Sequence, residues 1–164
     1  MTAFETLLDR FSAAVGAHDS NGLAALFAED GSYDDYFFGR HEGRAEIAQM
    51  LDRFHEGGER FHWQFLEPLS QGPLGYARYL FSYRSTQPES AGEMIVFEGM
   101  ARFRLRADGL IGEYAEVFDR GLAFSQLGYA PERIGKLMSR YAAGFRASER
   151  VAAHLQSRGD SAQS

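Results

Sequence analysis

The sequence contains no cysteine, which excludes disulfides, thiolate nucleophiles and cysteine-ligated zinc or iron–sulfur sites. It also has no apolar run near the roughly 18 residues that cross a bilayer, and no basic segment followed by an apolar stretch at its N-terminus. Basic clusters are missing as well, and the net charge of −6 argues against nucleic acid as a partner. These absences predict a cytoplasmic protein that binds neither membranes nor nucleic acid.

Aromatic residues are what the sequence has in plenty. It contains 14 Phe and 8 Tyr among 164 residues, which predicts an aromatic-lined interior with surface to spare for a ligand. The length suits one domain, because domains cluster near roughly 100–150 residues. We expect a single domain over residues 1–156 and a disordered tail over residues 157–164, which are small and polar.

The first part of the chain has helical periodicity. Thr2 and Glu5 form a capping-box pattern, and apolar residues recur every three or four positions as far as Gly16. A second, short helix is predicted from Asp19 or Ser20, with Leu23, Leu26 and Phe27 facing inward and Gly31 as a left-handed stop. After a short aromatic strand over residues 32–38, a third helix is predicted that ends at Gly57 and Gly58.

The period then changes from helical to two. Strand patterns with Gly- or Pro-containing turns between them cover residues 61–69, 76–85, 93–105 and 110–118. Their short connections predict an antiparallel meander. Pro131 begins a final helix over residues 131–156 with a long apolar stripe. The fold class is therefore α+β, with a curved sheet wrapped around helices and a cavity between them.

Three local motifs, in this order, carry a family resemblance. They are Ala17-His18-Asp19 with residues 23–30, then Tyr33-Asp34-Asp35 with residues 43–47, and finally residues 111–119 with Gln126-Leu127-Gly128. Together with the order of the predicted elements, they resemble the NTF2-like superfamily, a cone-shaped fold. Ketosteroid isomerases, SnoaL-like polyketide cyclases and limonene epoxide hydrolases share this cone. The resemblance covers residues 2 to about 128, and the final helix looks like an addition to the cone.

The resemblance places Asp35 where ketosteroid isomerases have their general base. A carboxyl group in an apolar, aromatic pocket has its charged form destabilised, which raises its pKa toward values useful for proton transfer. Asp34 is expected to point the other way along the strand. The alternative is that Asp34 and Asp35 both cap a strand end in solvent.

Glu116 and Tyr33 are the other catalytic candidates. SnoaL-like cyclases have an acid/base Asp at the position that Glu116 resembles, and Tyr114 and Phe118 share its face by strand alternation. Tyr33 shares the face of Asp35, where the epoxide hydrolases have a Tyr that helps to hold a water. Core packing is the alternative for Tyr33, and pairing with an arginine is the alternative for Glu116. The expected substrate-binding side chains are Tyr114, Phe11, Phe118, Trp63, Arg78 and Ala101.

The sequence also departs from each of these families. Phe11 and Ala101 stand where ketosteroid isomerases have the Tyr and the protonated Asp that stabilise an oxyanion, so their mechanism is not expected unchanged. The epoxide hydrolases need an Arg and an Asp two residues apart, and here Leu80 follows Arg78 at that distance. The five histidines have no metal-ligand spacing, so we expect no metal and no other cofactor.

Two functions of different classes remain open. The first is a cofactor-free isomerase, polyketide-cyclase-like or hydrolase-like enzyme, in which Asp35 and Glu116 transfer protons on a small apolar carbonyl or epoxide compound. The second is a non-catalytic module that binds a small apolar ligand or acts through association. A homodimer is expected, because Val96, Met100, Ala115 and Val117 would otherwise expose apolar surface on the convex side of the sheet. The final helix, from Pro131 to Gln156, is the other expected source of contact.

Overall fold

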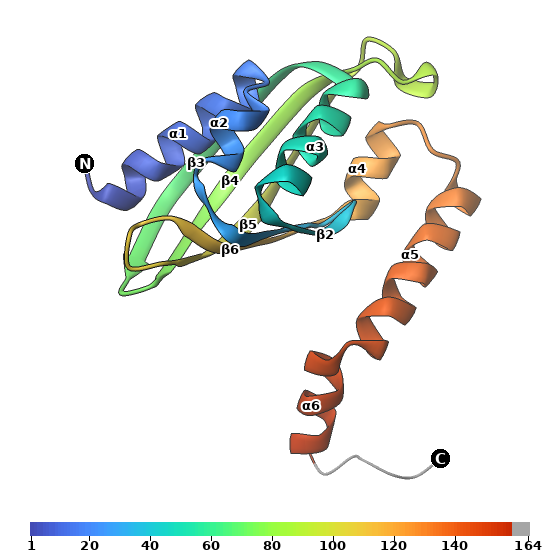
Figure 1. Cartoon of the computed structure of the whole chain (residues 1–164). Coiled ribbons are helices and arrows are strands. Elements are labelled where there is room, and N and C mark those ends of the chain that lie inside the picture. Colours follow the sequence, from blue (N-terminus) through green and yellow to red (C-terminus); the bar gives the residue numbers. More distant parts are fainter. Residues whose placement is uncertain (159–164) are drawn as a thin grey trace. The chain divides into compact units, whose positions relative to one another are not determined.

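A six-stranded sheet with helices before and after it makes up the first of two units of the chain (Figure 1). The computed structural model describes residues 1–158. The first unit comprises residues 1–128, and the second begins at Tyr129. The first unit contains the helices α1 (Ala3–Ala17), α2 (Ser20–Ala24), α3 (Gly43–Glu56) and α4 (Arg120–Gln126), and the short 3₁₀ helix η1 (Pro88–Ser90).

The sheet has the strand order β2-β1-β6-β5-β4-β3. Its strands are β1 (Phe27–Asp35), β2 (Gly39–Glu42), β3 (Gly58–Gln71), β4 (Leu74–Ser85), β5 (Met94–Leu105) and β6 (Ile111–Phe118). All neighbouring pairs are antiparallel except β1 and β6, which run parallel. The α+β class and the cone-like architecture are confirmed, and so is the meander of four long strands.

The core lies between α1 and the inner face of the sheet. The first helix begins at the predicted capping box, in which Thr2 and Glu5 each satisfy a free backbone N–H group. Its apolar face packs onto rings from the sheet: Phe4 lies 5.3 Å from Phe103, and Phe11 lies 5.5 Å from Trp63, between ring centroids. Edge-to-face and offset ring pairs of this kind stabilise the core beyond simple burial.

The second predicted helix is shorter than expected. It ends at Ala24, and β1 already begins at Phe27, so Leu26 and Phe27 do not belong to a helix. Gly31 lies inside β1, at an irregularity in its pairing with β6. A Cβ atom there would lie 2.8 Å from the carbonyl oxygen of Ile111. The prediction of a helix stop was therefore wrong, because this glycine permits close backbone contact between two strands.

Two elements of the first unit had no counterpart in the sequence prediction. The strand β2 has only four residues and forms a hairpin with β1, which a two-residue period cannot reveal at this length. The helix α4 follows directly after β6, and the Asp119 side chain caps it by accepting a hydrogen bond from the backbone N–H of Leu122.

The second unit consists of α5 (Pro131–Ala147) and α6 (Glu149–Ser157). The prediction of one continuous helix over residues 131–156 was wrong, because Ser148 adopts an extended conformation that separates the two helices. Pro131 begins α5 as expected. Ser157 ends α6 and is not part of the predicted tail, while residues 159–164 lie outside the described residues. That residues 1–156 form one domain stays a prediction. None of the described helices is long and apolar enough to span a membrane.

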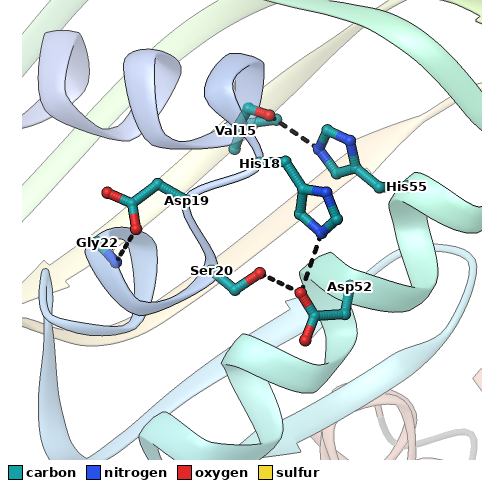
Figure 2. Close-up of polar contacts among 7 residues, drawn as sticks. All are labelled: Val15, His18, Asp19, Ser20, Gly22, Asp52 and His55. Carbon is teal, nitrogen blue, oxygen red and sulfur yellow. Dashed lines mark hydrogen bonds and ion pairs between the residues drawn. The ribbon is translucent and has the colours of Figure 1, made fainter.

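Two stacked histidine rings connect α1 with α3 (Figure 2). His18 ends α1 in a left-handed conformation, and its Nε2 atom lies 3.0 Å from Oδ1 of Asp52, which also accepts a hydrogen bond from the Ser20 hydroxyl. His55 on α3 donates its Nε2–H to the carbonyl oxygen of Val15 at 2.9 Å, and its ring centroid lies 4.0 Å from that of His18. Burial lowers the pKa of His55, and the positive charge that His18 can carry lowers it further.

Acidification below about pH 6.5 should therefore lower the contribution of His55 to the free energy of unfolding. The folded state disfavours the charged His55 ring. The contribution of His55 to stability is therefore complete above the ordinary histidine pKa and declines as the pH falls through that value. Asp52 stays ionised in this range, because hydrogen bonds from Ser20 and His18 lower its pKa. Urea unfolding at pH 7.0 and 5.5 should show that His55→Phe gains stability relative to the unaltered protein on acidification, and that the exposed His62→Phe control does not. This relative gain is below about 1 kcal/mol, because the His55 ring is partly solvated. The same pH dependence in both variants would contradict this assignment.

Candidate active site

Asp35 lies at the end of β1 with 5% of its surface exposed. Its Oδ1 atom accepts hydrogen bonds from the backbone N–H groups of Phe37 and Phe38, at 2.8 and 2.7 Å, and so closes the turn that leads into β2. Burial raises the pKa of Asp35, while these two hydrogen bonds oppose the rise. Asp35 is thus buried rather than in solvent, and it combines a turn-forming role with a destabilised charge.

Glu116 lies on β6 and is also buried, with 7% exposed. The Tyr114 hydroxyl donates a hydrogen bond to its Oε2 atom at 2.7 Å, and the Tyr36 backbone N–H lies 3.5 Å from Oε1. Burial raises the pKa of Glu116 to about 8, with a further contribution from the negative charge of Asp35. Glu116 therefore carries a proton at neutral pH. No arginine pairs with it among the hydrogen bonds and ion pairs of the described residues.

The parallel pairing of β1 with β6 brings the two carboxyl groups to one place. Tyr33 pairs with Tyr114 and Asp34 with Ala115, so the register continues to Asp35 beside Glu116. Because two buried carboxylates in such proximity repel each other, the pair retains a proton that isolated carboxyl groups would lose. The arrangement therefore places a carboxyl group that is protonated at neutral pH beside a second buried carboxyl group.

Aromatic rings enclose the pair on the inner side. The rings of Tyr33 and Tyr114 lie 4.3 Å apart, and Phe11 lies 5.2 Å from Tyr114 and 6.1 Å from Tyr33, between centroids. Burial raises the pKa of both tyrosines well above its ordinary value, and the charge of Glu116 adds to the effect. Tyr33 and Tyr114 therefore stay protonated and act as hydrogen-bond donors rather than as acids or bases.

A small cavity borders Asp35. It has a volume of about 10 Å³, which is close to the space that a single water molecule needs. Side chains from both α1 and α3 contribute to it together with the sheet; the lining residues are Val15, Leu23, Tyr33, Asp35, Met50, Leu51, Phe54 and Trp63. In this conformation the cavity has room for about one water molecule.

Four buried polar atoms around the site have no hydrogen-bond partner among the described residues: Ser32 Oγ, His41 Nδ1, Trp63 Nε1 and Tyr79 Oη. Sequence reasoning did not select His41 or Tyr79. Arg53 lies 3.1 Å from Nε2 of His41. Because a guanidinium group only donates, Nε2 is the acceptor and the unpartnered Nδ1 carries the proton.

A sequence signal for Tyr79 does exist. Ala77, Tyr79 and Phe81 alternate along β4, and this pattern would identify Tyr79 as inward-facing once the inner face of β4 is known.

Arg78 is the expected pocket residue that the structure places elsewhere. It lies on the outer face of β4, where its guanidinium group pairs with Glu67 at 2.9 Å and with Glu98 at 3.1 Å. The prediction was wrong because residues 78 and 79 alternate, and Tyr79 takes the inner face.

The remaining expected residues lie at different distances from the carboxyl pair. Phe118 stands at the end of β6 in a neighbouring ring cluster, 4.5 Å from Phe97 and 4.7 Å from Phe37 between centroids. Ala101 is buried on β5 opposite Glu116. Trp63 borders the cavity, and its part in substrate binding stays a prediction. Within residues 1–158, no group of three or more His, Asp or Glu side chains is placed to hold a metal ion.

The profile of the SnoaL-like domain family matches residues 8–114 of the chain. No curated protein matches the sequence.

Solved structures of the same fold have about one fifth of their residues identical to this chain. A protein from Catenulispora acidiphila with a ketosteroid isomerase-like fold, in complex with trimethylamine, has 20% identity and a TM-score of 0.69, over 77% of this chain and 95% of its own. A protein from Xanthomonas campestris pv. campestris that is provisionally named a polyketide cyclase has 22% identity and a TM-score of 0.64, over 76% of this chain and 96% of its own. An LEH-like epoxide hydrolase from M. tuberculosis has 19% identity and a TM-score of 0.61, over 74% of this chain and 86% of its own. At these identities the similarity establishes the fold.

The free energy of unfolding should fall as the pH rises from about 4.5 to about 8, because Glu116 keeps its proton in the folded state and loses it on unfolding. The stabilising contribution of protonated Glu116 is complete below the ordinary glutamate pKa. It is lost as the pH rises through the pKa that Glu116 has in the folded protein. Glu116→Gln should remove a decline of roughly 2–4 kcal/mol in denaturant titrations at pH 5 and 8. Glu113→Gln is the matched control on the same strand, with its carboxylate near Arg102 and Arg104. If Glu116→Gln kept the pH dependence of the unaltered protein, Glu116 would not carry the proton.

Proposed function

The chain belongs to the SnoaL-like domain family, and on this premise we propose that it is a cofactor-free acid/base enzyme. Its substrate is a small apolar carbonyl or epoxide compound, on which Asp35 and Glu116 transfer protons. The observation that carries the proposal is the buried carboxyl pair, in which burial raises both pKa values and Glu116 has a pKa of about 8. Two titratable groups that share protons in a dry, aromatic site suit general acid–base chemistry.

The roles of the two carboxyl groups follow from their contacts. Asp35 accepts two backbone hydrogen bonds at Oδ1, which favour its ionised form and orient it as the base. Glu116 holds a proton near pH 7 and is the acid. On a carbonyl compound, Asp35 takes a proton from the carbon beside the carbonyl group and Glu116 supplies one to the product. On an epoxide, Asp35 takes a proton from an attacking water, and Glu116 protonates the oxygen that leaves the ring carbon.

Substrate entry requires side chains to move, since the cavity has room for about one water. Met50 and Phe54 on α3 line the cavity, and methionine adapts its shape at low cost. The proposed enzyme therefore opens along α3 when a substrate binds, and the water in the cavity is displaced or used as a reactant.

The small cavity also supports a second candidate, a binding module without chemistry. Aromatic rings beside a carboxylate attract cationic amines through cation–π and ionic contacts. Tyr33 and Trp63 line the cavity together with Asp35 and provide such groups here. The structurally similar protein from C. acidiphila was solved in complex with trimethylamine. In this candidate the same residues select a small amine, and no bond is made or broken.

A substrate panel with Asp35→Asn separates the two candidates. Ketosteroids, polyketide aldehydes or ketones, and terpene epoxides are assayed for turnover, and Asp35→Asn should lower kcat by about 100-fold or more on any active compound. The amide is nearly the same size and still accepts the two turn hydrogen bonds. Asp34→Asn, on the opposite face of β1, is the control and should keep kcat within about twofold. Turnover that survives Asp35→Asn would reject the acid/base proposal, and trimethylamine binding without any turnover would favour the binding module.

We also propose that the protein is a homodimer through the outer face of the sheet. Leu80, Val96, Met100 and Val117 are exposed there, and Met100 pairs with Val117 on the neighbouring strand. An apolar patch on an antiparallel sheet is a common site for a second copy of the same chain.

Sedimentation at micromolar concentration should give about twice the monomer mass of 18.4 kDa. Val117→Lys should shift the equilibrium toward the monomer by at least about tenfold, because a buried, unpaired charge costs more than 1.4 kcal/mol. Leu122→Lys on α4 is the matched control with a similarly exposed apolar side chain. A monomer in the unaltered protein would reject the dimer.

A further inference from the structure

We propose that the indole N–H of Trp63 and the hydroxyl of Tyr79 together bind the reacting oxygen atom of the substrate, so that the site takes a carbonyl compound. This inference rests on the proposed function, and it adds which residues bind the substrate oxygen near the carboxyl pair. It assigns Trp63 and Tyr79 as a pair of oxygen-binding donors, a role that neither residue had in the acid/base proposal.

Both donors are buried and unpartnered. Trp63 is 6% exposed and Tyr79 is 1% exposed, and neither polar atom has a hydrogen-bond partner within the described part of the chain. A buried donor without an acceptor costs roughly 1–3 kcal/mol, and folded proteins contain few of them. The indole N–H can only donate. The missing partner is therefore an acceptor, which water provides in the empty site and a ligand oxygen provides in the occupied one.

The rings that carry the two donors lie beside each other on neighbouring strands. Their ring centroids are 4.6 Å apart, with Trp63 on β3 and Tyr79 on β4. Trp63 borders the cavity that Asp35 also lines. One oxygen atom has two lone pairs, so a single ligand oxygen can satisfy both donors.

Gly99 on β5 makes room for the Tyr79 ring to reach across the sheet. A Cβ atom at this position would lie 2.4 Å from the Tyr79 hydroxyl oxygen. The hydroxyl lies near the carboxyl group of Glu116; burial raises the pKa of Tyr79, and the charge of Glu116 raises it further. Tyr79 therefore stays protonated as a donor near Glu116, while Trp63 borders the cavity that Asp35 lines.

This placement suits a carbonyl oxygen that gains charge during the reaction. When Asp35 takes the proton from the neighbouring carbon, the C–H electron pair forms a carbon–carbon double bond and the carbonyl pair moves onto oxygen. Hydrogen bonds from Trp63 and Tyr79 then stabilise the enolate oxygen. The two donors thus supply the oxyanion stabilisation that Phe11 and Ala101 cannot provide. A cationic amine would meet only donors at this point, so the assignment favours the carbonyl compound over the amine.

The test uses the single tryptophan of the chain as a reporter. In ¹⁵N-labelled protein, the one indole N–H resonance is followed by NMR while cyclohexanone or tetramethylammonium is added. Cyclohexanone should move the indole proton downfield with a saturable curve, and tetramethylammonium should not. Tyr79→Phe and Gly99→Ala should each raise the Kd of cyclohexanone by about tenfold, because one hydrogen bond to the oxygen is lost. Tyr76→Phe, at an exposed position of the same strand, should leave the Kd unchanged.

Each other outcome overturns the assignment. If cyclohexanone binds without a downfield shift, or if Tyr79→Phe and Tyr76→Phe bind it equally, the oxygen is held elsewhere, and the acid/base function still stands or falls with Asp35→Asn. If tetramethylammonium binds and cyclohexanone does not, the donors do not select a carbonyl oxygen and the binding module gains support. If neither probe binds, the donors are satisfied by water alone and the assignment is rejected.

Discussion

The parallel contact between β1 and β6 is the interaction on which the site depends. It joins residues that are about 80 positions apart in the chain and fixes Asp35 beside Glu116. A slip of the register by one residue would turn Asp34 inward and Asp35 outward, since side chains alternate along a strand. The close approach of Gly31 to the Ile111 carbonyl oxygen lies within the same contact. The backbone therefore specifies the carboxyl pair before any side chain takes part.

Burying this pair is unfavourable, and the neighbouring groups reduce that cost without removing it. Asp35 receives two backbone hydrogen bonds, and Glu116 receives one from the Tyr114 hydroxyl. Even so, burial raises both pKa values, and the charge of Asp35 raises that of Glu116 further. Evolution toward stability alone would replace such residues with apolar ones of similar size. Their presence in an aromatic core is what supports the proposed acid/base chemistry.

The same aromatic packing that isolates the carboxyl groups also closes the site. The rings of Tyr33 on β1, Phe54 on α3 and Trp63 on β3 leave space for about one water beside Asp35. A closed, dry site strengthens electrostatic interactions but delays the entry of a substrate. The unpartnered donors of Trp63 and Tyr79 mark where such a closed site still lacks an acceptor. In the proposed function, opening along α3 and binding of a ligand oxygen are two parts of one process.

Local sequence patterns determined much of this architecture. The capping box of Thr2 and Glu5, the apolar period of α1 and the four long strands could be predicted, because each depends on contacts within a few residues or on a sustained alternation. The inward direction of Asp35 and Glu116 followed from the same alternation. Tertiary structure alone decided the early start of β1, the short strand β2 and the outward position of Arg78, since these depend on which face of a strand is covered and on pairing between distant segments. It also decided that Tyr79 reaches over Gly99 toward Glu116, because no pattern within β4 encodes a missing Cβ on β5.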